Sequence, residues 1–186
     1  MITPPVELYL IRHGIAADRK NYGNDEQRPV TDKGRRKTKK VAHQLHKLGK
    51  QFDLILTSPL VRARQTAEIL QAAGLSSQIE ESPWLAPDGN IYSWLGWLEK
   101  WRYDNGGSPH IPPYNRGDGQ RAAFMQLALV GHQPDLGNWA EILVWGNAKE
   151  KLVLKKAGVI GLMLPEIGTP LGKSQLFLLA APKWLL

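Results

Sequence analysis

The chain has 186 residues, of which 42% are hydrophobic and 22% charged, as in a soluble globular protein with one sizeable core. It has a formal net charge of +7 and no cysteine, which excludes disulfides, thiol nucleophiles and thiolate metal sites and fits a reducing compartment. No apolar stretch approaches the roughly 20 residues of a membrane span, and the first apolar run is too short for a secretory signal. We therefore expect a cytoplasmic protein that forms one domain over residues 1–186.

Three short apolar runs have the length and composition of buried strands. They are VELYLIR (6–12), FDLILTS (52–58) and MQLALVG (125–131). Near-continuous apolar runs are typical of strands that helices cover on both faces, and a segment with helical periodicity follows each run. Near the C-terminus, GVIGLML and SQLFLLAA indicate an antiparallel pair. The sequence thus predicts a three-layer α/β/α sandwich with a mostly parallel central sheet and an antiparallel C-terminal edge.

Helix starts and stops can be predicted after each run. Thr31 is a candidate N-cap for a helix whose apolar stripe is Thr38, Val41, Leu45 and Leu48. Ser58 followed by Pro59 is a serine cap with proline in the first helical position, and this helix is expected to run to about Gly74. Pro134 is expected to open a third helix.

The remaining segments are less regular. Residues 76–85 are a candidate strand, and residues 91–101 have the periodicity of a helix. The stretch 103–120 is rich in Gly, Pro, Asn and Asp, which predicts a long loop. Such a loop either lies disordered on the surface or closes as a flap over a site.

Basic side chains follow all three of the predicted parallel strands, at the ends where open α/β sheets bind ligands. The first run ends in Arg12 and His13, the second leads to Arg62, and the third is followed by His132. None of these ends offers a carboxylate. We therefore expect a cationic pocket, rich in hydrogen-bond donors, that suits a phosphoryl group.

Helical geometry separates Arg62 from the neighbouring Arg64. At about 100° per residue, Arg62 falls on the less polar side of its helix, whereas Arg64 faces solvent with Glu68 as its i+4 partner. Arg62 thus lacks an ordinary structural partner. It also lies in the first helical turn, where backbone N–H groups attract anions.

Two histidines beside two arginines predict phosphoryl transfer through a covalent intermediate. A neutral imidazole can attack phosphorus when its other N–H is held, and nearby cations favour the neutral form. The arginines then neutralise charge on the phosphoryl oxygens. This chemistry needs no metal, and we expect neither a metal nor another cofactor.

The motifs LYLIRHG, LTSPLVRARQTAEIL and LVGHQP resemble those of the histidine phosphatase superfamily, which includes phosphoglycerate mutases. The short chain and RPVTDKG are most similar to the SixA-type phosphohistidine phosphatases. The resemblance implies a phosphohistidine intermediate on His13 and a phosphate pocket of Arg12, Arg62 and His132. Arg28 is a candidate for a further contact with the substrate anion, or alternatively belongs only to the basic segment 28–50.

The sequence departs from this family at one position. Many members carry a glutamate acid shortly after a leucine, where WLAPDG places Pro87. An alkoxide leaving group needs a proton from an acid, whereas a histidine leaves phosphorus more readily. The departure therefore favours phosphohistidine substrates, although Asp88, Glu81 or Asp18 could still supply a proton.

The resulting prediction is a metal-independent phosphatase that acts on phosphohistidine in a signalling protein, such as a histidine-containing phosphotransfer domain. One alternative is a phosphatase for small phosphate monoesters or sugar phosphates. Another is a nucleic-acid-binding module that uses residues 28–50, ranked last because no aromatic residues interleave with those charges. A pseudo-enzyme that binds phosphorylated partners without turnover is the fourth.

Overall fold

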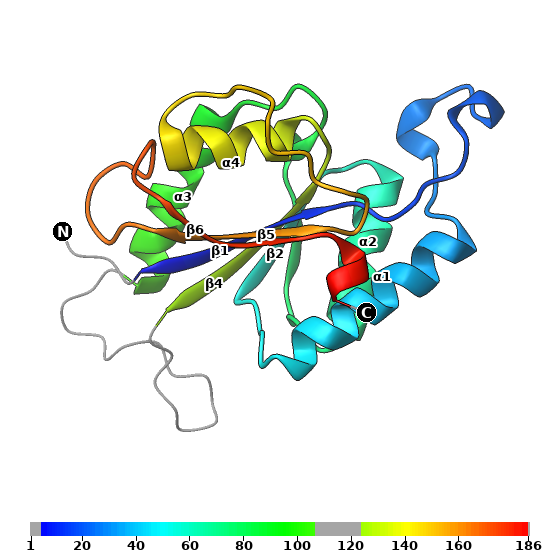
Figure 1. Cartoon of the computed structure of the whole chain (residues 1–186), viewed down its shortest axis with the longest axis horizontal. Helices are drawn as coiled ribbons and strands as arrows, with labels where there is room; N and C mark the ends of the chain where they lie inside the picture. Colours follow the sequence, from blue (N-terminus) through cyan, green and yellow to red (C-terminus); the bar gives the residue numbers. More distant parts are fainter. Residues whose placement is uncertain (1–4, 107–123, 186) are drawn as a thin grey trace.

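The computed structural model describes residues 5–106 and 124–185, in which six strands form one sheet of order β3-β2-β4-β1-β5-β6. The strands are β1 (Val6–Arg12), β2 (Leu54–Thr57), β3 (Ile79–Glu81), β4 (Met125–Gly131), β5 (Val159–Leu164) and β6 (Gln175–Ala180). Strands β1 to β4 run parallel to one another, whereas β5 pairs antiparallel with both β1 and β6 at the other edge (Figure 1). The predicted sheet, with a short strand within 76–85, is confirmed.

Four α-helices cover the two faces of this sheet within the described residues. They are α1 (Asp32–Lys47), α2 (Val61–Ala72), α3 (Ile91–Gly106) and α4 (Asp135–Trp145). Figure 1 shows α1 and α2 on one face and α3 and α4 on the other. The predicted three-layer sandwich is therefore confirmed. Short 3-10 turns supplement the helices: η1 (Arg19–Asn21), η2 (Asp25–Gln27), η3 (Pro83–Leu85) and η4 (Pro182–Trp184).

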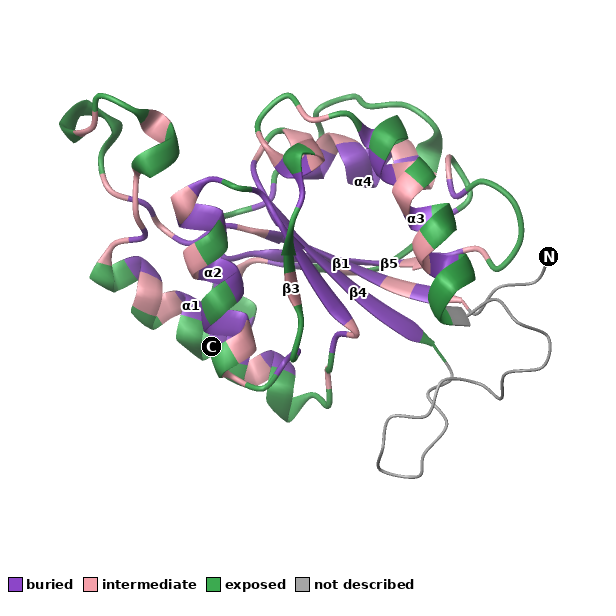
Figure 2. Cartoon of the chain, turned by 180° about the vertical axis from the view of Figure 1, so that it is seen from behind, coloured by how far each residue is buried: buried purple, intermediate pink, exposed green. Residues whose placement is uncertain are grey.

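The alternation of side chains along the central strands divides the core into two halves. In β1, Leu8 and Leu10 pack with the cluster under α3 and α4, whereas Tyr9 and Ile11 pack with the cluster under α1 and α2. All four side chains are buried. Figure 2 shows the central strands buried along most of their length. Burial on both faces explains why these strands are apolar runs rather than alternating patterns.

Helix α1 begins where its cap predicts. Thr31 adopts an extended backbone, and its hydroxyl oxygen accepts a hydrogen bond from the Gly34 N–H at 3.0 Å. Thr38, Val41 and Leu45 are buried as expected. Leu48 is 57% exposed, because the helix ends at Lys47 and Leu48 lies past its last turn.

The predicted start of α2 is wrong by two residues. The helix begins at Val61 with Leu60 as its N-cap, so Ser58 and Pro59 precede it. The Ser58 hydroxyl oxygen accepts a hydrogen bond from the Leu60 N–H at 3.3 Å, and the same hydroxyl also contacts His132. The end of the helix is close to the prediction, because Gly74 follows it with φ +82°.

Helix α3 is longer than predicted. It begins at Ile91 and continues to Gly106, so residues 103–106 of the expected loop are helical. The rest of that loop lies outside the described residues. Within the described part of the chain, no helix is both long and apolar enough to cross a membrane.

Candidate active site

The carboxyl ends of three parallel strands lie level at one edge of the sheet. In the strand register, Arg12 pairs with Gly131 and Thr57 pairs with Val130. The His13 N–H extends this register by donating to the Gly131 carbonyl at 3.0 Å. The residues that follow β1, β2 and β4 therefore start from one place, as the strand arrangement predicts.

The structure brings His13 and His132 together. Their ring centroids are 5.2 Å apart, and the residues are only 5% and 4% exposed. His13 Nδ1 lies 2.7 Å from the Gly14 carbonyl oxygen, which can only accept, so Nδ1 carries the proton. His132 Nε2 lies 2.8 Å from the Ser58 hydroxyl, the second partner of that side chain. The His13 ring is thus oriented by the next residue of its own loop, and the His132 ring by Ser58, which follows β2.

Both imidazoles are held in their neutral form. Burial, followed by His132 and then by Arg62 and Arg12, lowers the pKa of His13 to about 2, against the opposing effect of the Gly14 carbonyl. Burial and then Arg62 lower the pKa of His132 to about 4. A neutral imidazole with one protonated nitrogen retains a lone pair on the other, which is the state a nucleophile requires.

These pKa values predict that the free energy of unfolding falls as the pH is lowered from about 6.5 to 4. In this window the unfolded chain protonates both histidines and the folded chain does not, which costs up to about 1.4 kcal/mol per pH unit for each histidine. Urea denaturation between pH 7 and pH 4 measures the slope. The variant His13→Asn/His132→Asn should show a shallower slope, and an unchanged slope would contradict the assignment.

Arg62 reaches this edge from the first turn of α2, but the expectation that it lacks a structural partner is wrong. Its side chain is 4% exposed and bonds Asp25 twice, with Nη1 donating to the Asp25 carbonyl at 2.7 Å and Nη2 to the carboxylate at 3.0 Å. Arg64 also differs from prediction. It pairs with Glu81 at 3.2 Å instead of Glu68, because β3 lies beside this helix.

Two further arginines adjoin the histidines. Arg12 donates from Nη1 to the Leu154 carbonyl at 2.8 Å. Arg28 donates to the Ala17 carbonyl at 3.0 Å and pairs with Asp25 at 2.9 Å. The charges of Arg12 and Arg28 both act on His132, so the structure places these cations around the same imidazole. Among the described residues, the Nε atoms of Arg12 and Arg62 are buried without a hydrogen-bond partner, as donors for an oxyanion would be.

The loop that carries His13 has no room for a side chain at the next position. A Cβ on Gly14 would lie 2.7 Å from the Thr38 hydroxyl oxygen. The Gly14 N–H donates to the Thr66 hydroxyl at 3.0 Å, and that hydroxyl donates to the Arg62 carbonyl at 2.8 Å. Thr66 therefore links the histidine loop to the turn of α2 that presents Arg62.

Sequence reasoning missed several residues at this edge. Asp25 supplies the carboxylate that the strand ends lack, because η2 approaches from outside the strand–helix framework. Ser58, which the sequence predicts to be a helix cap, contacts His132. Lys156 lies close enough that burial and then the charges of Arg12, Arg28 and Arg62 lower its pKa. Of these residues, only Asp25 could have been suspected from the sequence, because it is an acidic residue three positions before Arg28.

The described residues of this site include no cluster of candidate metal ligands. Across residues 5–106 and 124–185, no group of three or more His, Cys, Asp and Glu side chains is placed to hold a metal ion. The groups that surround the histidines are mainly guanidinium donors, which match an anion in charge and geometry.

Comparison with known proteins agrees with this arrangement. The family model for the histidine phosphatase superfamily (branch 1) matches residues 8–86, which include Arg12, His13 and Arg62. An uncharacterized protein of Picosynechococcus sp. is 47% identical over 182 residues, covering 97% of this chain and 99% of that protein. The chain belongs to the histidine phosphatase superfamily. His132, which follows β4, lies outside the matched segment.

Other proteins with similar sequences or structures include phosphatases. Pgam5 of Drosophila mojavensis, a mitochondrial serine/threonine-protein phosphatase, is 41% identical over 63 residues, which are 34% of this chain and 21% of that protein. The structure of the protein histidine phosphatase SixA complexed with tungstate superposes with a TM-score of 0.76 at 21% identity, covering 97% of this chain and 99% of that chain. A phosphoserine phosphatase variant from Entamoeba histolytica superposes with a TM-score of 0.59 at 17% identity, covering 97% and 100% of the two chains. Membership of the histidine phosphatase superfamily makes the protein a phosphatase, and the solved structures show that it shares their fold.

Proposed function

We propose that this phosphatase removes the phosphoryl group from phosphohistidine on a cytoplasmic signalling protein, such as a histidine-containing phosphotransfer domain. In this proposal residues 1–186 act as one domain, and the reaction passes through a phosphohistidine on His13. Arg12, Arg62 and His132 bind the phosphoryl group, and Arg28, from the segment between β1 and α1, makes a further contact with the substrate anion. The observation that carries the proposal is the pair of buried neutral imidazoles surrounded by guanidinium groups.

His13 would act as the nucleophile through Nε2. Because Nδ1 donates to the Gly14 carbonyl, the lone pair of Nε2 is available to attack phosphorus. The new N–P bond forms as the bond between phosphorus and the substrate histidine breaks, and the substrate imidazole leaves with a proton from solvent. Water then attacks the phosphorus on His13, releasing inorganic phosphate and restoring the free imidazole.

The second histidine would stabilise charge on the phosphoryl oxygens. The Ser58 hydroxyl accepts from the Leu60 N–H, so its own proton can be donated to His132 Nε2. Nδ1 of His132 then carries the proton and can donate it in a hydrogen bond to an oxygen of the transferring group. With the arginines, this arrangement supplies fixed donors where charge is held during transfer.

The carboxyl groups support a substrate whose leaving group needs little protonation. Of the acids expected from the sequence, Glu81 is paired with Arg64, Asp18 accepts from the Lys20 N–H, and Asp88 is exposed. Burial alone would raise the pKa of Asp25, yet Arg62 and then Arg28 lower it, so this carboxylate holds no proton at neutral pH. P–N cleavage tolerates that arrangement better than ester cleavage does.

One acid favours the second candidate function, hydrolysis of phosphate monoesters. Asp135 opens α4, three residues after His132, and burial raises its pKa while the Asp88 N–H opposes the rise. A carboxyl group with a raised pKa is a better proton donor to an alkoxide than an ordinary carboxyl group at neutral pH. Asp135 is therefore the residue to test if esters prove to be substrates.

The proposed function predicts a strong preference for P–N bonds. Phosphate release would be measured at pH 7 for a histidine-phosphorylated phosphotransfer domain, phosphoserine, p-nitrophenyl phosphate and a hexose phosphate. We expect kcat/KM for the phosphohistidine protein to exceed that for each ester by about 100-fold or more. This ratio corresponds to a difference of about 2.7 kcal/mol in activation free energy.

The variant Asp135→Asn sharpens the comparison. It should leave phosphohistidine turnover unchanged if that reaction needs no acid. Faster turnover of an ester than of the phosphohistidine protein, together with its loss in Asp135→Asn, would instead establish the monoesterase. Binding of phosphorylated protein without turnover of any substrate would make the chain a pseudo-enzyme.

A further inference from the structure

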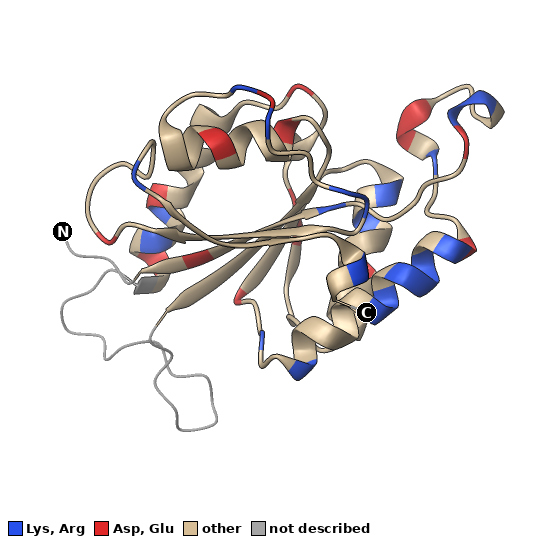
Figure 3. Ribbon diagram, in the orientation of Figure 1, with Lys and Arg blue, Asp and Glu red and all other residues tan. Residues whose placement is uncertain are grey.

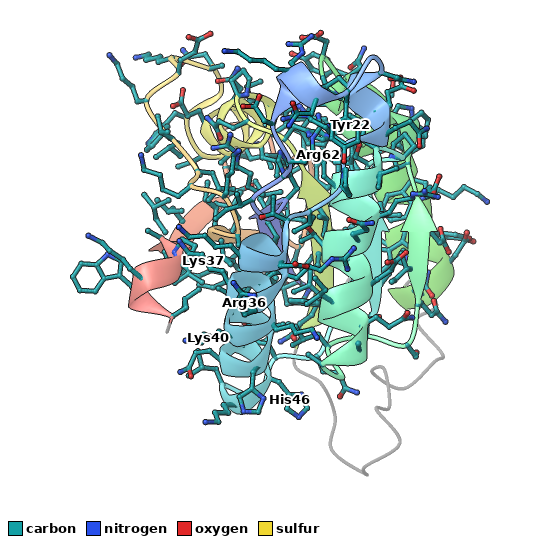
Figure 4. All side chains as sticks on the ribbon, turned by 90° about the vertical axis from the view of Figure 1, so that its right-hand side faces the viewer. Tyr22, Arg36, Lys37, Lys40, His46 and Arg62 are labelled. Carbon is teal, nitrogen blue, oxygen red and sulfur yellow. The ribbon has the colours of Figure 1, made fainter. Side chains whose placement is uncertain are left out.

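One side of α1 carries a stripe of positive charge. Its members, which we call the basic face, are separated by about one or two helical turns and so lie on one side of the helix: Lys33, Arg36, Lys37, Lys40 and Lys47. All are exposed except Lys37, which is half-buried. Figure 3 shows Lys and Arg gathered along α1, and in Figure 4 the labelled Arg36, Lys37 and Lys40 lie along this helix.

The basic face is not neutralised by the protein itself. Helix α1 contains seven Lys and Arg residues against Asp32 alone. The ion pairs formed among the described residues involve none of these seven cations. A solvated helix of a stable protein usually intersperses acidic residues at i+4 spacing, which lowers self-repulsion. Here the repulsion is retained, as expected for a surface that meets an acidic partner.

The helix that carries the basic face also packs on the active-site loop. The buried side of the same helix packs on the loop of the nucleophile, since a Cβ on Gly34 would lie 2.3 Å from the Ile15 carbonyl oxygen and Thr38 lies against Gly14. Thr31 fixes the start of the helix by donating to the Ile15 carbonyl from its N–H at 2.8 Å. A partner that presents a phosphoryl group to His13 would therefore meet the outer side of α1.

An exposed aromatic residue flanks this surface. Trp184 is 76% exposed in the turn η4, which Figure 1 shows beside α1 near the C-terminus. The next residue, Leu185, joins the core cluster that contains Val41 and Leu45 of α1. A single large apolar side chain beside charges is typical of a protein interface, whereas single-stranded nucleic acid is gripped by successive stacked aromatics.

We infer that the basic face of α1 is the docking surface for the phosphorylated protein, and that this partner is acidic around its phosphorylated histidine. The inference rests on the proposed function and adds the charge of the partner and the place where it binds. Docking would supply affinity and speed association, and the active-site residues would act only on the phosphoryl group.

Charge reversal on the basic face provides the test. The double variant Arg36→Glu/Lys40→Glu changes two exposed residues that contact neither histidine. Its substrates would be a phosphotransfer domain with acidic residues around its phosphohistidine, histidine-phosphorylated histone H4, which is basic, and phosphoramidate, a small P–N compound. At low salt we expect KM for the acidic domain to rise about tenfold or more with kcat unchanged. Turnover of phosphoramidate and of the basic histone should not fall.

A matched control carries the same net charge. Lys100→Glu/Lys173→Glu changes two exposed residues, on α3 and on the segment between β5 and β6, at the opposite end of the sheet from the site. It should leave KM for the acidic domain unchanged. Raising the salt to about 0.3 M should narrow the difference between wild type and the basic-face variant, because screening shortens the reach of exposed charges.

Several results would overturn the inference. An unchanged KM in the basic-face variant would do so, and so would equal losses in both double variants, which would show only the effect of net charge. Loss of phosphoramidate turnover would place the effect in the active site. Loss of affinity for a fluorescent oligonucleotide with an unchanged KM would assign the surface to nucleic acid. If wild type cleaves no phosphohistidine, the proposed function fails, and direct binding of the unphosphorylated domain by calorimetry still tests the docking surface.

Discussion

Replacing His13 by alanine is expected to abolish turnover and the covalent intermediate together. His13 is the only described imidazole whose Nδ1 is fixed by a main-chain carbonyl while Nε2 remains available. Without it the phosphoryl group has no nucleophile, and kcat should fall by about four orders of magnitude or more. Rapid mixing with a labelled phosphohistidine protein, followed by alkaline quench, should trap label on wild type. That label should survive base, be lost in acid and be absent from the variant.

The control for this experiment is another histidine. His43 is exposed on α1, away from the strand ends, so His43→Ala should label and turn over like wild type. The His13→Ala protein should keep its circular dichroism spectrum, which separates loss of chemistry from loss of fold. Label that persists in His13→Ala and disappears in His132→Ala would reverse the roles assigned to the two histidines.

Replacing Arg62 by alanine should cost far more activity than stability. Its guanidinium would hold the phosphoryl oxygens, and loss of one such fixed donor lowers kcat by about 100- to 1,000-fold. Removing a buried ion-pair partner can cost about 3–5 kcal/mol when it isolates a charge. Here Asp25 keeps Arg28 at 2.9 Å and is partly solvated, so we expect a loss of about 1–2 kcal/mol. Steady-state kinetics and urea denaturation measure the two effects.

A neighbour on the same helix serves as the comparison. Arg64 lies two residues later and pairs with an exposed carboxylate, so Arg64→Ala should change kcat/KM by less than about twofold and stability by at most about 1 kcal/mol. Equal activity losses in the two variants would assign Arg62 a structural role through Asp25. A normal kcat in Arg62→Ala would remove it from the phosphoryl site.

The fold was largely predictable because the pattern of apolar residues along each strand and helix indicates which of its faces are buried. Strands such as VELYLIR are apolar on both faces since helices cover both, and Thr31 caps α1 through its own hydroxyl. The start of α2 was not predictable from local preference. Ser58 has the composition of a cap, but its hydroxyl is drawn to His132, which lies 74 residues away in the chain. A tertiary contact there outweighs the local preference.

The same distinction holds for the candidate site. Residues that follow buried strands directly can be placed from sequence, because parallel strands bring their ends together. Asp25 and Lys156 reach the site on turns whose paths depend on contacts between distant segments, such as the Ala157 N–H donating to the Arg12 carbonyl at 3.1 Å. No spacing rule encodes such paths, so the charge balance of the site emerged only with the structure.

The short contact between the His13 ring and the carbonyl of the next residue determines which isomer of phosphohistidine can form on the enzyme. Phosphorylated imidazole exists as two isomers, and only the one with phosphorus on the nitrogen remote from the main chain is compatible with that contact. An antibody or spectrum specific for the other isomer should therefore find nothing on this protein. A single peptide oxygen thus confers regioselectivity on a ring whose two nitrogens are otherwise similar nucleophiles.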